Sequence, residues 1–326
     1  MSQGSGVRGQ GLKTEKTAFV FPGQGSQYVG MGQELLARFS AARGVFEEAS
    51  SVLHKDMVKL CTEGDDARLN LTENTQPAIL TLSVALWQVL NQENPAIIPL
   101  YLAGHSLGEY TALVVSGAMS FKDAVRVVNA RGRFMQEAVP ERVGAMAAVL
   151  GLNGSVVSNI CKEVSTLTHV VVAANFNSPE QTVISGNKES VEKASLVAKE
   201  KGAKRVIPLP VSVPSHSPLM NPAAKRLKEE LATVDIKPLN TPVITNVEAE
   251  PITSPDRVKE LLVSQLYSPV RWVDTIIKMK DLGITKIIEI GPSKVLTGLV
   301  KRIDSNIETM NVEKAEDVKT VGEFRS

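Results

Sequence analysis

The chain has 326 residues, of which 43% are hydrophobic and 22% are charged, and its formal net charge is +1. This composition is typical of a globular protein that can build one large core and a second small one. The balanced charge and an aromatic content of 4% argue against a nucleic-acid-binding or anionic-membrane-binding protein. Both of those need a basic surface, and base binding also needs stacking side chains.

Cysteine usage and hydropathy favour a cytoplasmic location. Cys61 and Cys161 lie far apart and have neither a metal-binding nor a redox spacing, so we expect reduced thiols and no metal site. Residues 1–16 are polar and glycine-rich and lack the apolar core of a signal peptide, which predicts a flexible N-terminal tail. The sequence has no run of about 18 apolar residues, so no membrane span is expected.

The first part of the chain combines buried strands with helices. Strands are predicted over 17–21 and 97–102, because both are apolar runs. Helices are predicted over 31–38, 42–60, 74–91, 109–116 and 124–138. The loop Pro22–Gln27 is glycine-rich, but Tyr28 stands where a dinucleotide-binding motif needs its third glycine. We therefore interpret this loop as backbone N–H groups and the Gln24 amide, held beside a group that becomes negative.

After Pro140 the pattern changes to strand, helix, strand, strand, helix, strand. The predicted ranges are 145–150, 154–166, 170–174, 181–185, 187–201 and 204–209. This order is that of the ferredoxin-like βαββαβ unit. We place the unit over 140–211, as a small subdomain inserted into a larger one.

The chain then returns to the large domain. Helices are predicted over 221–233, 255–265 and 270–282, strands over 242–245 and 286–290, and a last helix that ends near Ile303. The segment 304–326 is charged and is predicted to fray as a C-terminal tail. The fold class is therefore α/β: a hydrolase-like large domain with a mostly parallel sheet over 17–139 and 212–303, and the inserted ferredoxin-like subdomain.

The stretch Gly104-His-Ser-Leu-Gly108 matches the pattern G-x-S-x-G between a predicted strand and a predicted helix. This arrangement places a serine on a tight turn with its hydroxyl exposed, and it is typical of acyl-transferring and hydrolytic enzymes. Glu109 follows at a position where a carboxylate suits the helix dipole. The alternative is a glycine-rich turn in which Ser106 has no chemical role.

A serine nucleophile needs a base, and the chain has four histidines. His54 lies in a polar helix, His169 begins a strand as a rim or core residue, and His105 adjoins Ser106, where we expect it to support the site. His216 lies in a loop with prolines on both sides, which gives the rigidity that a positioned base needs. His216 is therefore the predicted base; the alternative is that it caps the helix that starts near Asn221.

The sequence offers no evident third member of a triad. Asp123, Glu137 and Glu163 lie between Ser106 and His216, but on predicted helices rather than at strand ends. A dyad oriented by an amide or a backbone carbonyl is therefore plausible.

Two further groups have a candidate chemical role. The backbone N–H of Leu107 is the expected first donor of an oxyanion hole, and the Gln24 backbone is a candidate second donor; alternatively Gln24 satisfies its own turn. Arg131 lies among the apolar side chains of a helix, where a guanidinium needs a carboxylate partner. That partner is either an internal carboxylate or a substrate; alternatively, the side chain snorkels to the surface.

These segments together resemble the malonyl-CoA:acyl carrier protein transacylases of bacterial type II fatty-acid synthesis. The matching blocks occur in the family's order: Phe19–Gln27, Gly104–Glu109, Arg131–Gln136, Asn175–Pro179, Val213–Ser217, Gln265–Trp272 and Glu289–Pro292. The resemblance covers about 17–303.

The resemblance implies a ping-pong transfer of malonyl from malonyl-CoA to the phosphopantetheine thiol of acyl carrier protein, without a cofactor of its own. Ser106 would carry the malonyl ester and His216 would act as general base and acid. The N–H groups of Gln24 and Leu107 would form the oxyanion hole, and Arg131 would hold the malonyl carboxylate. By the same resemblance, the backbone carbonyl of Gln265 would orient the histidine. Asn175 would have a supporting role.

The resemblance also implies a partner surface. Acyl carrier protein is acidic, so contact is expected through local basic residues. The protein itself is expected to be a monomer. The candidates are Lys188, Lys201, Lys204, Arg205, Lys294, Lys301 and Arg302. Ser215 stands where many relatives have a bulkier aromatic residue, which suggests a wider tolerance for branched malonyl groups. Two other functions stay open at this point: a serine esterase or thioesterase, and a non-catalytic acyl-CoA binder.

Overall fold

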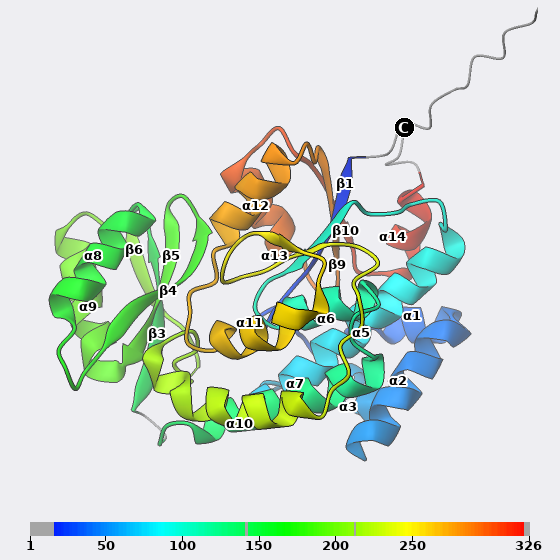
Figure 1. The fold of residues 1–326 in the computed structure, drawn as a ribbon, viewed down its shortest axis with the longest axis horizontal. Helices are drawn as coiled ribbons and strands as arrows, with labels where there is room; N and C mark the ends of the chain where they lie inside the picture. Colours follow the sequence, from blue (N-terminus) through cyan, green and yellow to red (C-terminus); the bar gives the residue numbers. More distant parts are fainter. Residues whose placement is uncertain (1–15, 141–142, 212, 323–326) are drawn as a thin grey trace, which may run out of the picture.

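The computed structural model describes residues 16–140, 143–211 and 213–322, and its fold is shown in Figure 1. It contains a six-stranded sheet in the order β10-β9-β1-β2-β7-β8 and a separate four-stranded sheet. The strands of the large sheet are β1 (Thr17–Phe21), β2 (Tyr101–Gly104), β7 (Val243–Ile244), β8 (Pro251–Ile252), β9 (Lys286–Ile290) and β10 (Glu308–Val312). All neighbours in this sheet are parallel except β7 and β8. The predicted α/β class is confirmed.

Helices cover both faces of the large sheet. They are α1 (Gln33–Arg38), α2 (Ser40–Leu53), α3 (Met57–Thr62), α4 (Asp66–Leu69), α5 (Thr72–Glu93), α6 (Gly108–Val115), α7 (Phe121–Glu137), α10 (Asn221–Ala232), α11 (Val258–Gln265), α12 (Trp272–Asp281), α13 (Val295–Ile303) and α14 (Ala315–Thr320), with short 3₁₀ turns at Pro218–Met220 and Pro255–Arg257. Side chains alternate along β1, so Phe19 and Phe21 join the core beneath α2, α5 and α7, whereas Ala18 and Val20 join the core beneath α12 and α13.

The four-stranded sheet has the predicted βαββαβ order. Its elements are β3 (Gly144–Leu150), α8 (Gly154–Val164), β4 (Val171–Ser178), β5 (Gln181–Asn187), α9 (Lys188–Glu200) and β6 (Arg205–Pro208). The strands pair antiparallel in the order β4-β5-β3-β6. The sheet and its two helices form the green part of Figure 1, to the left of the large sheet. One face packs on α8 and α9, and the other carries a small apolar cluster around Met146, Ala174 and Val183. The boundaries at 140 and 211 stay a prediction.

The C-terminal segment corrects one expectation. Residues 304–326 were expected to fray, but β10 extends the parallel sheet beside β9 and α14 follows it. Val312, Ala315, Val318 and Val321 are buried, and this apolar spacing within a charged segment is what holds it on the core. Residues 1–15 of the predicted N-terminal tail lie outside the described part of the chain.

Two element boundaries also differ from the prediction. The helix expected over 42–60 is divided into α2 and α3, because His54 has a left-handed backbone (φ 51°) and Asp56 starts a new helix by accepting a hydrogen bond from the Lys59 amide. The strand expected over 97–102 is β2, which begins only at Tyr101. Within the described ranges, no helix is both long and apolar enough to cross a membrane.

Candidate active site

Ser106 lies on a sharp turn between β2 and α6. Its backbone is left-handed (φ 50°), an unusual conformation for a serine. Only glycine fits at position 108, because a β-carbon there would overlap the Phe21 carbonyl of β1. The His105 amide donates to the same carbonyl at 3.0 Å. The turn is thus packed against the neighbouring strand, and Ser106 stands at the carboxyl edge of the sheet.

The Ser106 hydroxyl contacts His216, 110 positions further along the chain. Ser106 Oγ lies 2.9 Å from His216 Nε2, and His216 Nδ1 lies 2.8 Å from the Gln265 carbonyl oxygen. Because a carbonyl only accepts, Nδ1 carries the proton and Nε2 is left to accept from the serine. His216 is 3% exposed. Burial, together with the Arg131 charge, lowers the pKa of His216 to about 3, so the neutral base is the form present near pH 7.

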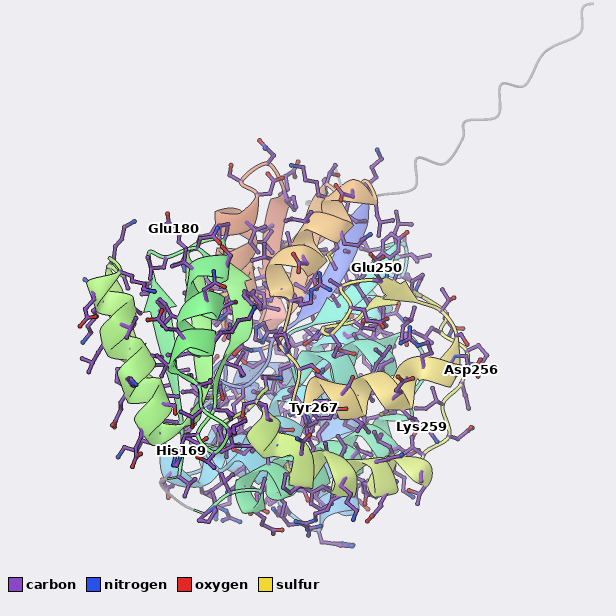
Figure 2. All side chains as sticks on the ribbon, turned by 60° about the vertical axis from the view of Figure 1, so that its left-hand side comes forward. His169, Glu180, Glu250, Asp256, Lys259 and Tyr267 are labelled. Atoms are coloured by element: carbon purple, nitrogen blue, oxygen red, sulfur yellow. The ribbon has the colours of Figure 1, made fainter. Side chains whose placement is uncertain are left out.

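The other histidines lie apart from Ser106 Oγ or contact it only indirectly. His54 and His169 are exposed, and Figure 2 shows His169 on the surface of the four-stranded sheet region. His105 Nε2 lies 2.8 Å from Asn177 Oδ1, and its ring meets the Trp272 ring edge-on at 5.6 Å. His216 does not cap α10, since that helix begins without a side-chain cap. His216 itself has a left-handed backbone, φ 58°.

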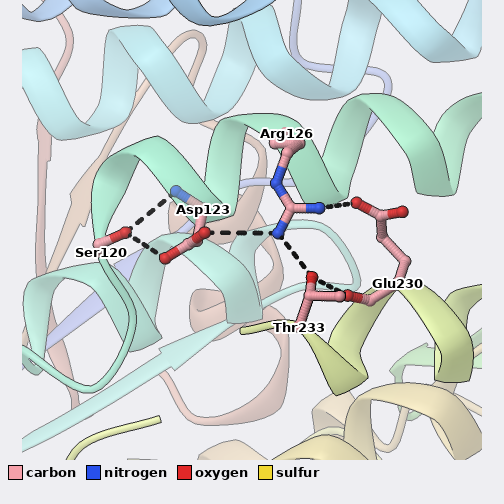
Figure 3. Close-up of polar contacts among 5 residues, drawn as sticks. All are labelled: Ser120, Asp123, Arg126, Glu230 and Thr233. Carbon is pink, nitrogen blue, oxygen red and sulfur yellow. Dashed lines mark hydrogen bonds and ion pairs between the residues drawn. The ribbon is translucent and has the colours of Figure 1, made fainter. Parts of the chain in front are cut away.

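The arginines of α7 show two different environments. Figure 3 shows Arg126 between Asp123 and Glu230, with its guanidinium also donating to Thr233 Oγ1 at 3.1 Å. This is the internal ion pair that a helical arginine ordinarily makes. Arg131, on the same helix, is 1% exposed and has no carboxylate partner among the described residues.

Arg131 is instead held by amides and by the nucleophile. NH1 donates to Gln76 Oε1 at 2.8 Å, and NH2 donates to Gln265 Oε1 at 3.0 Å and to Ser106 Oγ at 3.2 Å. Its Nε is buried with no acceptor among the described residues. Among the described residues, no carboxylate contacts this guanidinium directly, although Glu109 lies near enough to attract it, so its free Nε–H is suited to an anion that comes from outside the chain.

A cavity of about 180 Å³ joins these groups and lies against the apolar cluster of the four-stranded sheet. Its lining is Gln24, His105, Ser106, Leu107, Arg131, Met135, Met146, Asn175, Asn177, Val183, Leu209, Val211, Val213, Ser215 and His216. Every site residue predicted from the sequence lines it except Gln265, which contacts both Arg131 and His216. Asn175 on β4 is buried, with its backbone bridged to Val270.

The loop after β1 lies directly on the serine turn. A β-carbon at Gly23 would overlap the His105 carbonyl oxygen, so only glycine allows this approach. The Gln24 side chain donates to Thr72 Oγ1 at 3.4 Å. Among the described residues, the backbone N–H groups of Gln24 and Leu107 have no recorded backbone acceptor, and both residues line the cavity.

Sequence reasoning missed three polar residues that contact the site. Asn246 accepts from the Ser106 amide at 2.7 Å and donates to the Gly104 carbonyl at 2.6 Å. It follows β7, whose carboxyl end shares the sheet edge of β2, so parallel-strand topology is a signal that could have revealed it. Gln76 on α5 gave no such signal. Glu109, interpreted as a helix-dipole carboxylate, is buried and contacts Asn246 and Gln265.

No group of three or more histidine, cysteine, aspartate or glutamate side chains suited to a metal ion occurs in the described ranges.

Residues 18–325 match the family described as the acyl transferase domain. A malonyl CoA-acyl carrier protein transacylase of Bacillus subtilis (strain 168) is 50% identical over 304 residues, which are 93% of this chain and 95% of the relative. The protein of the same name from Escherichia coli (strain K12) is 50% identical over 88% of this chain and 92% of its own.

Solved structures give the same result. An acyl carrier protein S-malonyltransferase of Vibrio cholerae superposes with a TM-score of 0.91 at 46% identity, over 94% of this chain and 100% of its own. A malonyl-transacylase solved in complex with a type II polyketide synthase acyl carrier protein superposes with a TM-score of 0.92 at 45% identity, over 94% and 99%. The chain therefore belongs to the acyl transferases, and within them to the malonyl-CoA:acyl carrier protein transacylase family.

Proposed function

We propose that Ser106 carries the malonyl group between two thiols, and that this ester is how the chain performs its family's reaction. The chain transfers malonyl from malonyl-CoA to acyl carrier protein and so supplies fatty-acid synthesis. The observation that supports Ser106 is its 2.9 Å contact with His216 Nε2, with Nδ1 held by the Gln265 carbonyl. A serine with a positioned neutral imidazole is the unit required for acyl transfer.

In the first half-reaction, Ser106 Oγ attacks the thioester carbonyl carbon and its proton passes to His216 Nε2. The tetrahedral intermediate collapses, the C–S bond breaks, and the CoA sulfur takes the proton from His216. The Arg131 contact with Ser106 Oγ favours negative charge on the attacking oxygen. We assign the oxyanion to the N–H groups of Leu107 and Gln24, which line the same cavity without a recorded backbone acceptor in the described part of the chain.

In the second half-reaction, His216 removes the proton of the phosphopantetheine thiol of acyl carrier protein. The thiolate sulfur attacks the malonyl ester, the C–O bond to Ser106 breaks, and the serine oxygen recovers the proton from His216. The same imidazole therefore acts as base and then as acid in each direction.

We assign the malonyl carboxylate to Arg131. Its NH2 group has two N–H bonds, of which one is donated to Gln265 and the other to Ser106 Oγ. After acylation Ser106 Oγ becomes an ester oxygen, which accepts hydrogen bonds weakly, so the second N–H becomes available to the carboxylate. An acetyl group offers no anion for this site, so Arg131 would gain no direct carboxylate contact.

The partner surface stays a prediction, and the positions of the basic residues narrow the choice among its candidates. Lys204 pairs with Glu180 at 3.2 Å, and Arg302 on α13 donates to Gln181 Oε1 at 2.9 Å. Both basic groups therefore lie beside the turn between β4 and β5, which Glu180 marks in Figure 2. Lys188 lies at the opposite end of β5 and Lys201 pairs with Glu163. We propose that the carrier contacts the group formed by Lys204, Arg205, Lys301 and Arg302. We also propose a cytoplasmic monomer, in keeping with two free, buried cysteines.

Intact-mass measurement tests the ester. After mixing with malonyl-CoA, the protein should gain one malonyl increment, which peptide mapping should place on Ser106, and a Ser106→Ala variant should gain none. Adding acyl carrier protein should discharge the adduct faster than water does. An adduct that water discharges as fast would indicate a thioesterase, and the absence of any adduct would indicate a non-catalytic acyl-CoA binder.

A further inference from the structure

Glu109 is a buried carboxyl group that the mechanism above does not use. It lies in the first turn of α6, three residues after Ser106, and is 2% exposed. One of its oxygens, Oε2, accepts two hydrogen bonds: from the Asn246 amide at 3.0 Å and from Gln265 Nε2 at 2.9 Å. Each of these two partners also contacts the nucleophile, so Glu109 joins two supports of the same serine.

The first support is the Gln265 side chain. Its Nε2 donates to Glu109 and to the Ser106 carbonyl at 3.1 Å, while its Oε1 accepts from Arg131 NH2. A glutamine amide can turn over and exchange its oxygen and nitrogen at nearly the same volume. A carboxylate and a carbonyl only accept and a guanidinium only donates, so Glu109, the Ser106 carbonyl and Arg131 all select the orientation in which Oε1 faces Arg131. Without the carboxylate, one of these three constraints, and the only negatively charged one, is lost.

The second support is Asn246. Glu109 accepts from its backbone amide, and its side chain bridges the Gly104 carbonyl and the Ser106 amide. These bonds flank the residue with the left-handed backbone. This branch acts on every acyl substrate equally, because it fixes the nucleophile and not the group that recognises the carboxylate.

We propose that Glu109 is a positioning residue for malonyl selection, because its carboxylate fixes the Gln265 amide that holds the Arg131 guanidinium toward the acyl group. The inference rests on the proposed role of Arg131. Glu109 touches neither Ser106 Oγ nor the cavity. It therefore acts through Gln265, and its loss should affect an acyl group with a carboxylate more than one without.

The charge state of Glu109 should make the selection of malonyl over acetyl depend on pH. Burial raises the pKa of Glu109 to about 7, although Asn246, Gln265 and Arg131 oppose the shift. The titratable groups around it are Arg131, Tyr110, whose pKa burial raises further above its usual range, and His216 and His105, whose pKa values burial lowers. Of these groups, only Glu109 changes its charge near pH 7. The negative charge of Glu109, and with it the extra strength of its two charge-assisted hydrogen bonds, is therefore lost as the pH falls through about 7.

The variant Glu109→Gln tests the proposal, since it keeps the volume and one accepting oxygen but also offers an N–H₂ group. Single-turnover acylation of Ser106 should fall about 10- to 100-fold with malonyl-CoA, the range for one weakened hydrogen bond to a charged group. With acetyl-CoA the fall should be smaller, so the ratio of malonyl to acetyl rates should drop. The matched control is Glu289→Gln, another buried carboxylate, which binds the amides of Leu296 and Thr297. The control should leave the ratio unchanged.

A second measurement needs no variant. In the unsubstituted protein, the ratio of malonyl to acetyl acylation rates should decrease as the pH falls through about 7, because the Glu109 carboxylate is then protonated. The malonyl carboxylate itself stays ionised over this range, since an ordinary carboxyl group titrates near 4. The decrease should be absent in Glu109→Gln. A constant ratio from about pH 5.5 to 8.5 would overturn the proposal.

The outcomes separate this inference from the function on which it rests. If Arg131→Ala lowers the ratio but Glu109→Gln lowers both rates equally, Arg131 recognises the carboxylate and Glu109 is only structural. If Arg131→Ala leaves the ratio unchanged, the proposed role of Arg131 fails. The double variant Glu109→Gln/Arg131→Ala should have the ratio of Arg131→Ala alone, because the two residues act on one contact. Additive effects would contradict that linkage.

Discussion

Replacing Arg131 by alanine removes a cation that donates hydrogen bonds to two amide oxygens and to the nucleophile, and that lies 5.6 Å from the centre of the Tyr110 ring. In the malonyl ester, the same guanidinium is expected to donate two hydrogen bonds to the carboxylate, from the N–H released by Ser106 Oγ and from the Nε–H, which has no acceptor among the described residues. Hydrogen bonds to a charged group contribute about 1.5–3 kcal/mol each, so the loss is about 3–6 kcal/mol of transition-state stabilisation. Malonyl transfer to Ser106 should therefore slow by about 10²- to 10⁴-fold.

The assay is single-turnover acylation followed by intact mass, with malonyl-CoA and acetyl-CoA in parallel. Acetyl transfer should change less, because the acetyl group makes no contact with the missing charge and the reaction loses only the Arg131 contact with Ser106 Oγ. Arg126→Ala is the matched control: it lies on the same helix, its side chain is 39% exposed, and it is paired with Glu230, so its loss should alter the rate little. A loss below about tenfold, or an equal loss for both substrates, would refute the reasoning.

Three other changes have defined outcomes. In the Glu109→Gln variant, which has no group at position 109 that titrates, acetyl transfer should stay constant between about pH 5 and 8, since the lowered pKa of His216, about 3, keeps the base neutral until the pH falls toward that value; a rate loss centred near 6.5 would show an ordinary histidine. Ser215→Phe should reduce methylmalonyl transfer more than malonyl transfer, because Ser215 lines the cavity; an equal reduction for both substrates would contradict this. Asn246→Ala should lower the free energy of unfolding in urea by about 1–3 kcal/mol, since the buried Ser106 amide and Gly104 carbonyl lose their partner; an unchanged unfolding curve would exclude that contribution.

The local elements were the part of the fold most accessible from sequence. Apolar runs predicted β1 and β9, and the strand-helix order after Pro140 predicted the four-stranded sheet. The errors occurred where a local pattern competes with tertiary packing. Because the segment that contains β10 and α14 is rich in charged residues, it was predicted to fray. Its few apolar side chains are nevertheless enough to hold both elements on the core. A continuous helical pattern likewise predicted one helix where the structure has α2 and α3, because a single left-handed residue, His54, turns the chain between them.

The sequence by itself determined the chemical groups of the site. The glycines around Ser106 specify a tight turn, because a β-carbon cannot fit there. The chain has only four histidines, so the other three could be set aside and His216 identified as the base. The apolar neighbours of Arg131 identified it as an unusual helical arginine that needs an anionic partner. Each of these conclusions depends on a few adjacent residues, which is why pattern alone could reach them.

Only the tertiary structure decided what those groups face. Helical periodicity places Arg131 among apolar side chains, but it shows neither that the guanidinium is buried nor that amides rather than a carboxylate contact it. The contacts of Ser106 with His216 and Asn246, and of Glu109 with Gln265, join residues more than 100 positions apart. Such contacts depend on how the strands order in the sheet and how the four-stranded sheet packs on the cavity. No local pattern encodes that packing.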